Sequence, residues 1–377
     1  MSEHPHTDSR EPLLRIAKRD ALPLWKNWAI RLAAVVLALL VCAVVVYATV
    51  KLSPLKVYAA MWSGAFGTVR RSWVTVRDSM LLLCVGIGLA PAFKMRFWNI
   101  GGKGQFIVGA IVAAVVAFKA GAVLPGAVTL LLMCLAAMAA AGAYGAIAAA
   151  LKVRFGTNET LLTLMLNYIA LYALIFLGET KAEWNFLLNP ESVRPTFGSF
   201  ASLASFPGIS IGKFNLNVCV ILTFVIGVLV FIYLKYTKHG YEIAVVGDSV
   251  GTARYAGIKV NRVVLRTVFL SACLIGLAAA FKVGTAGILS TAITDDVGWT
   301  GVIVAWLAKL NTVGIFLVSA LIGVLDYGST VAASSFSAVD SSFANMLQGV
   351  ILFTVLTADF LIRFRVVIAR KGEPAHE

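Results

Sequence analysis

Long, uninterrupted apolar runs are the feature that most restricts how this chain can fold. Ala33–Val50 and Leu124–Ala150 contain no charged residue and show no alternation of apolar and polar side chains. A bilayer is crossed either by helices of about 20 apolar residues or by closed barrels whose strands alternate. The runs therefore predict membrane-spanning α-helices. The composition agrees, because 60% of the residues are hydrophobic and 13% are charged, as in polytopic membrane proteins.

The runs predict an all-α polytopic membrane protein with about ten transmembrane helices in one membrane domain, residues 28–362. The expected spans are Trp28–Val50, Val74–Phe93, Phe106–Phe118, Leu124–Leu151, Leu161–Leu177, Leu216–Leu234, Val263–Phe281, Gly298–Ala308, Thr312–Leu325 and Phe343–Ile362. Gly284–Val297 interrupts this series with two glycines, several Ser and Thr residues and an acidic pair. We interpret that segment as broken or re-entrant.

Charge predicts the orientation of these spans. Ten crossings place the basic tails, residues 1–27 and 363–377, on one side, and most of the 32 Lys and Arg residues fall in segments on that side. The positive-inside rule makes it the cytoplasm, so both termini are expected to be cytoplasmic. The net charge of +14 is thereby explained without nucleic acid. The longest outer loop, residues 178–215, is a candidate surface for a soluble partner.

A polar cytoplasmic segment, residues 238–262, separates two of the predicted spans. Asp248 is a good N-cap, and Gly257 can take the left-handed conformation that ends a helix. A two-turn helix over Ser249–Ala256 would place Val250, Ala253 and Ala256 on one small-residue face. That face is either part of an ordinary capped loop or a surface that docks onto a partner. The candidate docking residues are Glu242, Asp248, Gly251, Ala253, Arg254, Ala256 and Gly257.

The string FWNIGGKGQFIVG, starting at Phe97, lies between two predicted spans. Its glycines allow a tight turn, and Asn99 and Gln105 are its polar members. It lacks the spacing and the preceding strand of a Walker A phosphate loop. A structural hinge between packed helices is the simpler interpretation.

Two further clusters combine polar residues with a span. In TNETLLTLMLNYI, starting at Thr157, Asn158 suits an N-cap and Glu159 suits the helix dipole. Thr163 and Asn167 continue a polar stripe, which either lines a pathway or hydrogen-bonds to other helices. Asp295, Asp296 and Trp299 suit a polar or hydroxyl-rich ligand, or equally an interfacial loop with an anchoring tryptophan.

Three strings carry a resemblance to a known family: FWNIGGKGQ, TNETLLTLMLNYI and GYEIAVVGDSVGTARYAGI. They resemble the permease subunits of ABC importers for sugars, nucleosides and branched-chain amino acids. The second string is most similar to nucleoside permeases that work with lipoproteins of the basic membrane protein type. The first departs from the family pattern at Trp98 and at Lys103, which replaces the usual acidic residue.

The resemblance implies a subunit of the cell inner membrane that imports nucleosides by alternating access. Its expected partners are ABC ATPase subunits, a second permease that is homologous or identical, and an extracytoplasmic substrate-binding protein or lipoprotein. ATP and Mg would be held by the ATPases, so this chain is expected to bind no cofactor or metal and to have no catalytic residue. Residues 238–262 would couple to the ATPases.

The same resemblance places a substrate pathway near the polar clusters. The candidate pathway residues are Asn99, Gln105, Asn158, Glu159, Thr163, Asn167, Asp295, Asp296 and Trp299. Phe281 and Trp306 are candidates to stack on a base. Ribose or another sugar is the alternative substrate. An ion-coupled secondary transporter is the alternative class, and it predicts isolated ionisable residues in mid-span, of which the sequence shows few.

Overall fold

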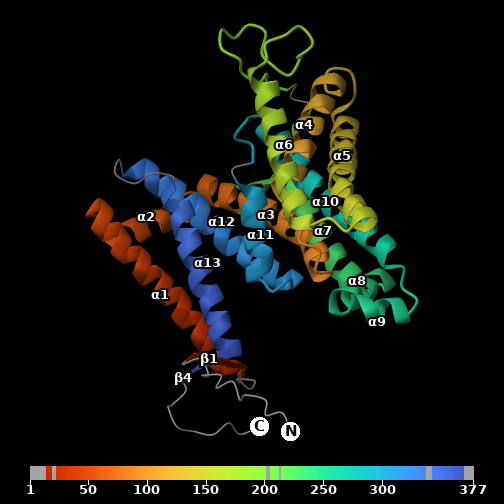
Figure 1. The fold of residues 1–377 in the computed structure, drawn as a ribbon. Coiled ribbons are helices and arrows are strands. Elements are labelled where there is room, and N and C mark those ends of the chain that lie inside the picture. Colours follow the sequence, from red (N-terminus) through yellow and green to blue (C-terminus); the bar gives the residue numbers. More distant parts are fainter. Residues whose placement is uncertain are drawn as a thin grey trace, which may run out of the picture. The chain divides into compact units, whose positions relative to one another are not determined.

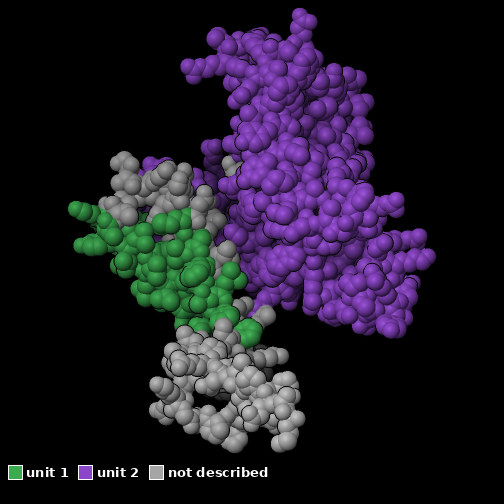
Figure 2. All heavy atoms as spheres, viewed as in Figure 1, with its two compact units in different colours: residues 1–57, 338–377 green, residues 58–337 purple. Residues whose placement is uncertain are grey.

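The computed structural model describes residues 14–18, 23–200, 204–211, 214–294, 296–336 and 342–368. The chain divides into two compact units, residues 1–57 with 338–377, and residues 58–337 (Figure 2). Asp295, one of the candidate pathway residues, lies outside the described residues.

The first unit is built from the two ends of the chain. Helix α1 (Leu24–Val50) packs along α13 (Ser342–Arg363) (Figure 1). Small residues on α1, Ala34, Ala38 and Cys42, recur every fourth position and are buried, as expected for closely packed membrane helices. Strand β1 (Leu14–Lys18) pairs antiparallel with β4 (Phe364–Ile368). The two tail segments therefore lie together.

The second unit is a helical bundle centred on α3 and α10. Its longer helices are α3 (Val69–Lys94), α4 (Gly102–Ala120), α5 (Gly126–Phe155), α6 (Glu159–Glu179), α7 (Val218–Tyr236), α10 (Val260–Ala286) and α12 (Thr312–Ser335). Gly276 of α10 shows how closely the bundle packs, because a Cβ there would lie 2.4 Å from the Ala137 carbonyl oxygen of α5. Small residues at such contacts let helix backbones approach one another in a membrane.

Shorter elements complete the unit. They are α2 (Pro54–Phe66), α8 (Lys238–Asp248), α9 (Val250–Tyr255), α11 (Val297–Leu307) and the hairpin of β2 (Gly208–Ile211) with β3 (Phe214–Asn217). The hairpin begins in the predicted outer loop and ends two residues beyond it, at Asn217, so the fold is mainly helical with short strands added. Figure 1 places α8 and α9 at the opposite end of this unit from the loop that follows α6.

Seven helices of the described chain are long and apolar enough to cross a membrane: α3, α4, α5, α6, α7, α10 and α12. They confirm a multi-pass, mainly helical membrane protein, while the count of ten spans and the side of the tails stay predictions. The prediction that Gly298–Ala308 forms a complete span is wrong. Helix α11 has 11 residues, or about 16 Å, and a hydrocarbon core is about 30 Å thick.

Candidate functional site

The break between α3 and α4 is the centre of a buried polar network. Residues 95–101 are not helical, and Arg96 within them has a φ of 58°. The Asn99 amide donates to Gln105 Oε1 at 3.2 Å, and Gln105 Nε2 donates to Asn99 Oδ1 at 2.9 Å. The Gly101 N–H also donates to Asn99 Oδ1. Both side chains are buried, so this pair closes the turn that carries the chain into α4.

Helix α6 holds the same break from another side. Asn167 accepts from the Gly104 N–H at 2.7 Å and donates to the Ile100 carbonyl at 2.9 Å. The Ile100 N–H donates to Thr163 Oγ1 at 3.3 Å. Of the two interpretations of the polar stripe, hydrogen bonding between elements is therefore present for Thr163 and Asn167. Their part in a pathway stays a prediction.

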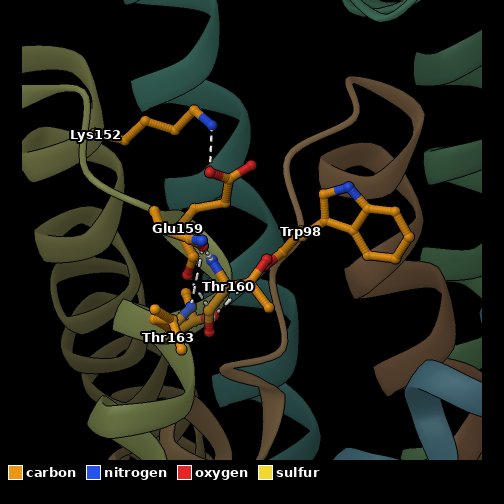
Figure 3. A network of polar contacts seen from close by, with 7 residues as sticks. Trp98, Lys152, Glu159, Thr160 and Thr163 are labelled. Carbon is orange, nitrogen blue, oxygen red and sulfur yellow. Dashed lines mark hydrogen bonds and ion pairs between the residues drawn. The ribbon is translucent and has the colours of Figure 1, made fainter.

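The start of α6 is fixed to the end of α5 by an ion pair between Lys152 and Glu159 (Figure 3). The predicted N-cap is confirmed, because Asn158 Oδ1 accepts from the Thr160 N–H at 3.0 Å. Glu159 therefore has a cationic partner as well as its favourable place in the first turn. Figure 3 shows the indole of Trp98 pointing away from this ion pair.

A second ion pair joins the first turns of α4 and α11. Lys103 Nζ donates to Asp296 Oδ1 at 2.7 Å, and the Asp296 side chain is 56% exposed. The helices begin in contact, since a Cβ on Gly298 would lie 2.4 Å from the Lys103 nitrogen. The lysine that departs from the family pattern thus has a carboxylate partner far away in the sequence. Sequence reasoning identified Asp296 but did not assign Lys103 as its partner.

Three exposed tryptophans lie on α11 and in the break that leads into α4. The Trp98 and Trp306 rings are stacked, with centroids 5.0 Å apart and an interplanar angle of 18°. Trp299 and Trp306 are seven residues apart on α11, which places them on one face of the helix. Trp98, Trp299 and Trp306 are 45%, 39% and 37% exposed. Phe281, the other aromatic candidate, is buried against Phe206.

The predicted cytoplasmic segment forms two helices, α8 and α9, where one was expected. The prediction that Asp248 is the N-cap is wrong, because Asp248 ends α8. Ser249 has an extended backbone, and its Oγ accepts the Thr252 N–H at 3.2 Å, so it caps α9. Gly257 has a φ of 73°, which confirms the predicted left-handed residue.

The exposed surface of α9 also differs from the expected one. Ala253 is fully buried, because α9 packs against α8 and α10, so only Val250 and Ala256 of the small-residue face are exposed. Tyr255 is instead 97% exposed and Val250 is 45% exposed. Gly251, Arg254, Ala256 and Gly257 are exposed as well. The surface is larger and more aromatic than the sequence pattern suggested.

Helix α8 is fixed to both central helices of the bundle. Glu242 accepts from Arg266 of α10 at 2.9 Å and lies 3.4 Å from His239. The hydrogen bond from Arg266 holds the pKa of the Glu242 carboxyl below its ordinary value. Gly247 lies against the end of α3, where a Cβ would be 2.0 Å from the Lys94 carbonyl oxygen. No periodic signal in the sequence marks Gly247 or Arg266 for these contacts.

Comparison with known proteins gives one family and several relatives. Residues 74–356 match the family described as branched-chain amino acid transport system / permease component. The chain is 29% identical to the guanosine ABC transporter permease protein NupP of Bacillus subtilis, over 81% of this chain and 86% of the relative. It is 26% identical to the nucleoside ABC transporter permease protein NupB of Lactococcus lactis, over 74% and 77%. It is 27% identical to the glucose ABC transporter permease protein TsgB13 of Haloferax volcanii, over 96% of both.

Proposed function

Because the chain belongs to the family of branched-chain amino acid transport system permease components, we propose that it is the permease subunit of an ATP-driven ABC importer for nucleosides. Two of its relatives are a guanosine and a nucleoside permease. The structural observation that carries the proposal is the exposed α8–α9 segment, which is fixed to the central helices α3 and α10. The segment offers a partner a surface that is mechanically joined to the membrane bundle.

The energy for transport comes from partner ATPase subunits in this proposal. They hold ATP and Mg, and this chain binds neither and catalyses no bond change. Their movement reaches α8 and α9 through the exposed Val250 and Tyr255. It then passes to α10 through the Glu242–Arg266 ion pair and to α3 through Gly247. Because Gly247 touches the last residue of α3, movement of α8 also reaches the break that holds Asn99.

The remaining partners occupy the outer face and the membrane. A second permease, homologous or identical, completes the passage, and a substrate-binding protein or lipoprotein docks on the outer loop. A groove in that loop is lined by Lys181, Glu183, Asn185 and neighbouring residues, which suits a polar protein surface. The pairing of β1 with β4 supports a location of both tails on one side, and their basic residues favour the cytoplasmic side of the inner membrane.

Sugar is the second candidate substrate, because the glucose permease relative covers the chain almost completely. The alternative class, an ion-coupled carrier, requires ionisable groups that bind and release an ion within the bundle. Four of the charges in or beside the described spans form two ion pairs: Arg77 with Asp78 at 3.0 Å and Lys103 with Asp296 at 2.7 Å. This pairing favours the ATP-driven mechanism.

Reconstitution tests the proposal. The chain is purified with the proteins that bind it in mild detergent and placed in liposomes, and uptake of radiolabelled guanosine, uridine and glucose is measured with and without ATP. We expect nucleoside uptake that needs ATP and stops when the Walker A lysine of the ATPase is replaced. Uptake by this chain alone without ATP would refute the ABC mechanism. ATP-driven uptake of glucose but not of nucleosides would show that the substrate is a sugar.

A further inference from the structure

The Lys103–Asp296 ion pair lies deep within the membrane part of the bundle. Gly104, next to Lys103, hydrogen-bonds to Asn167 of α6. Asn167 is two turns beyond Glu159, the first residue of α6, which is about 12 Å along the helix axis. Because α6 is long and apolar enough to cross a membrane, a point about 12 Å from its first residue lies inside a hydrocarbon core about 30 Å thick when α6 crosses the bilayer.

At this depth, the exposure of the Asp296 side chain restricts what can lie beside it. Its side chain is 56% exposed in the single chain, and a charged group facing lipid acyl chains is strongly disfavoured. The exposed face of α7 provides the contrast, because Phe224, Val225 and Leu229 there are apolar and 47–57% exposed. The α7 face suits lipid, whereas the surface around Asp296 must face water or protein.

The exposed tryptophan rings determine which ligands that surface can bind. We name as the tryptophan face the set of Trp98, Lys103, Asp296, Trp299 and Trp306. The indole rings are flat and exposed, and bases stack on such rings with little preference for sequence. The ion pair adds a donor and an acceptor for the polar edge of a base or for a ribose hydroxyl.

We propose that the tryptophan face lines the substrate passage, and that a nucleobase stacks on its indole rings while the nucleoside hydrogen-bonds to Lys103 and Asp296. The stacking and hydrogen-bonding assignments rest on the proposed function. The assignment of a water-filled passage rests instead on the depth and exposure of the ion pair, which exclude lipid beside Asp296 and leave water or protein.

Thiol labelling tests the passage without reference to the substrate. Trp299→Cys is compared with Leu229→Cys, which places a thiol on the apolar α7 face, in the complete transporter in nanodiscs. A hydrophilic thiol reagent reaches both sides of the disc, and it reacts with the thiolate, which forms in water and not in lipid. Protein without either change supplies the background from the five native cysteines.

We expect the Cys variant at position 299 to react at least about tenfold faster than the variant at 229 in one or more nucleotide states, with guanosine slowing the reaction. Equal, slow reaction of both variants with no nucleotide, with ATP and with a non-hydrolysable analogue would overturn the passage. That result is also the one expected if the face were a sealed contact with the second permease.

Transport kinetics test the stacking. Trp306→Leu removes the ring, Trp306→Phe keeps an aromatic surface, and Trp62→Leu removes an exposed tryptophan elsewhere. We expect Trp306→Leu to raise the KM for nucleoside about tenfold, with Trp306→Phe close to the unchanged protein and Trp62→Leu without effect. An unchanged KM in Trp306→Leu would overturn stacking on this ring.

The two proposals fail in different ways. If the transporter moves glucose and not nucleosides while position 299 labels rapidly, the passage stands and the nucleoside assignment fails. If nucleosides are transported in an ATP-dependent way while position 299 labels no faster than position 229, the proposed function stands and the tryptophan face is not the passage.

Discussion

Replacing Asn99 by leucine tests whether the buried network stabilises the break between α3 and α4. Leucine has the same branched arrangement of side-chain heavy atoms as asparagine, but it is bulkier and cannot hydrogen-bond. The change leaves four groups without their Asn99 partner: Gln105 Oε1, Gln105 Nε2, the Gly101 N–H and Ser271 Oγ. Hydrogen bonds between membrane helices average about 0.6 kcal/mol in mutant cycles, while an orphaned buried group costs about 1–3 kcal/mol. We therefore expect the free energy of unfolding to fall by about 2–3 kcal/mol.

A double-mutant cycle with Gln105→Leu separates this effect from a simple change of shape. Unfolding of the purified protein is followed in mixed micelles with increasing SDS. Because Asn99 and Gln105 are each other's main partners, the double variant should lose at least about 1 kcal/mol less than the sum of the single losses. Asn189→Leu, at an exposed asparagine of the outer loop, should be nearly neutral. Additivity within about 0.5 kcal/mol would show that the two amides do not act as a pair.

Three other changes concern α8 and α9. Gly247→Ala places a Cβ 2.0 Å from the Lys94 carbonyl oxygen; we expect a loss of about 1–3 kcal/mol in stability and less substrate moved per ATP hydrolysed, measured in liposomes. Glu242→Gln weakens the ion pair with Arg266. Since the pKa of Glu242 is lowered on folding, its stabilisation is present above its ordinary pKa of about 4.5 and is lost as pH falls through the lowered pKa. The melting temperatures of the unchanged protein and of Glu242→Gln should thus differ near pH 7 and converge in acid. A difference that stays constant with pH would contradict this. Tyr255→Ala removes a side chain that is 97% exposed; it should leave the melting temperature unchanged and weaken copurification of the ATPase.

Helix positions could be predicted from the sequence wherever apolar residues ran without interruption. The sixth expected span, Leu216–Leu234, differs from α7 by two residues at each end. The ninth expected span, Thr312–Leu325, ends just before Asp326 and Tyr327. Helix α12 continues through them to Ser335, and the Thr330 hydroxyl donates to the Asp326 carbonyl at 3.0 Å. A polar residue such as Asp326 therefore does not mark the end of a helix when the helical hydrogen bonding continues beyond it.

The candidate site could be predicted only where its chemistry is local. The cap at Asn158 and the left-handed Gly257 depend on neighbouring residues, and both are confirmed. Asp248 and Ser249 are adjacent and both are good caps, so local physics could not choose between them. The partner of Lys103 lies 193 positions away, and the burial of Ala253 depends on packing against other helices. Contacts of this kind follow from the tertiary fold.

The pairing of β1 with β4 has a consequence for how the protein is made. The first unit draws α1 and β1 from the beginning of the chain and α13 and β4 from its end. During synthesis, which proceeds from the N-terminus at about 5–20 residues per second, α1 enters the membrane first and waits for α13 until translation is nearly complete. A chain that lacks α13 leaves the small-residue stripe of α1 without the helix that covers it, so the first unit is completed only when the end of the chain has been made.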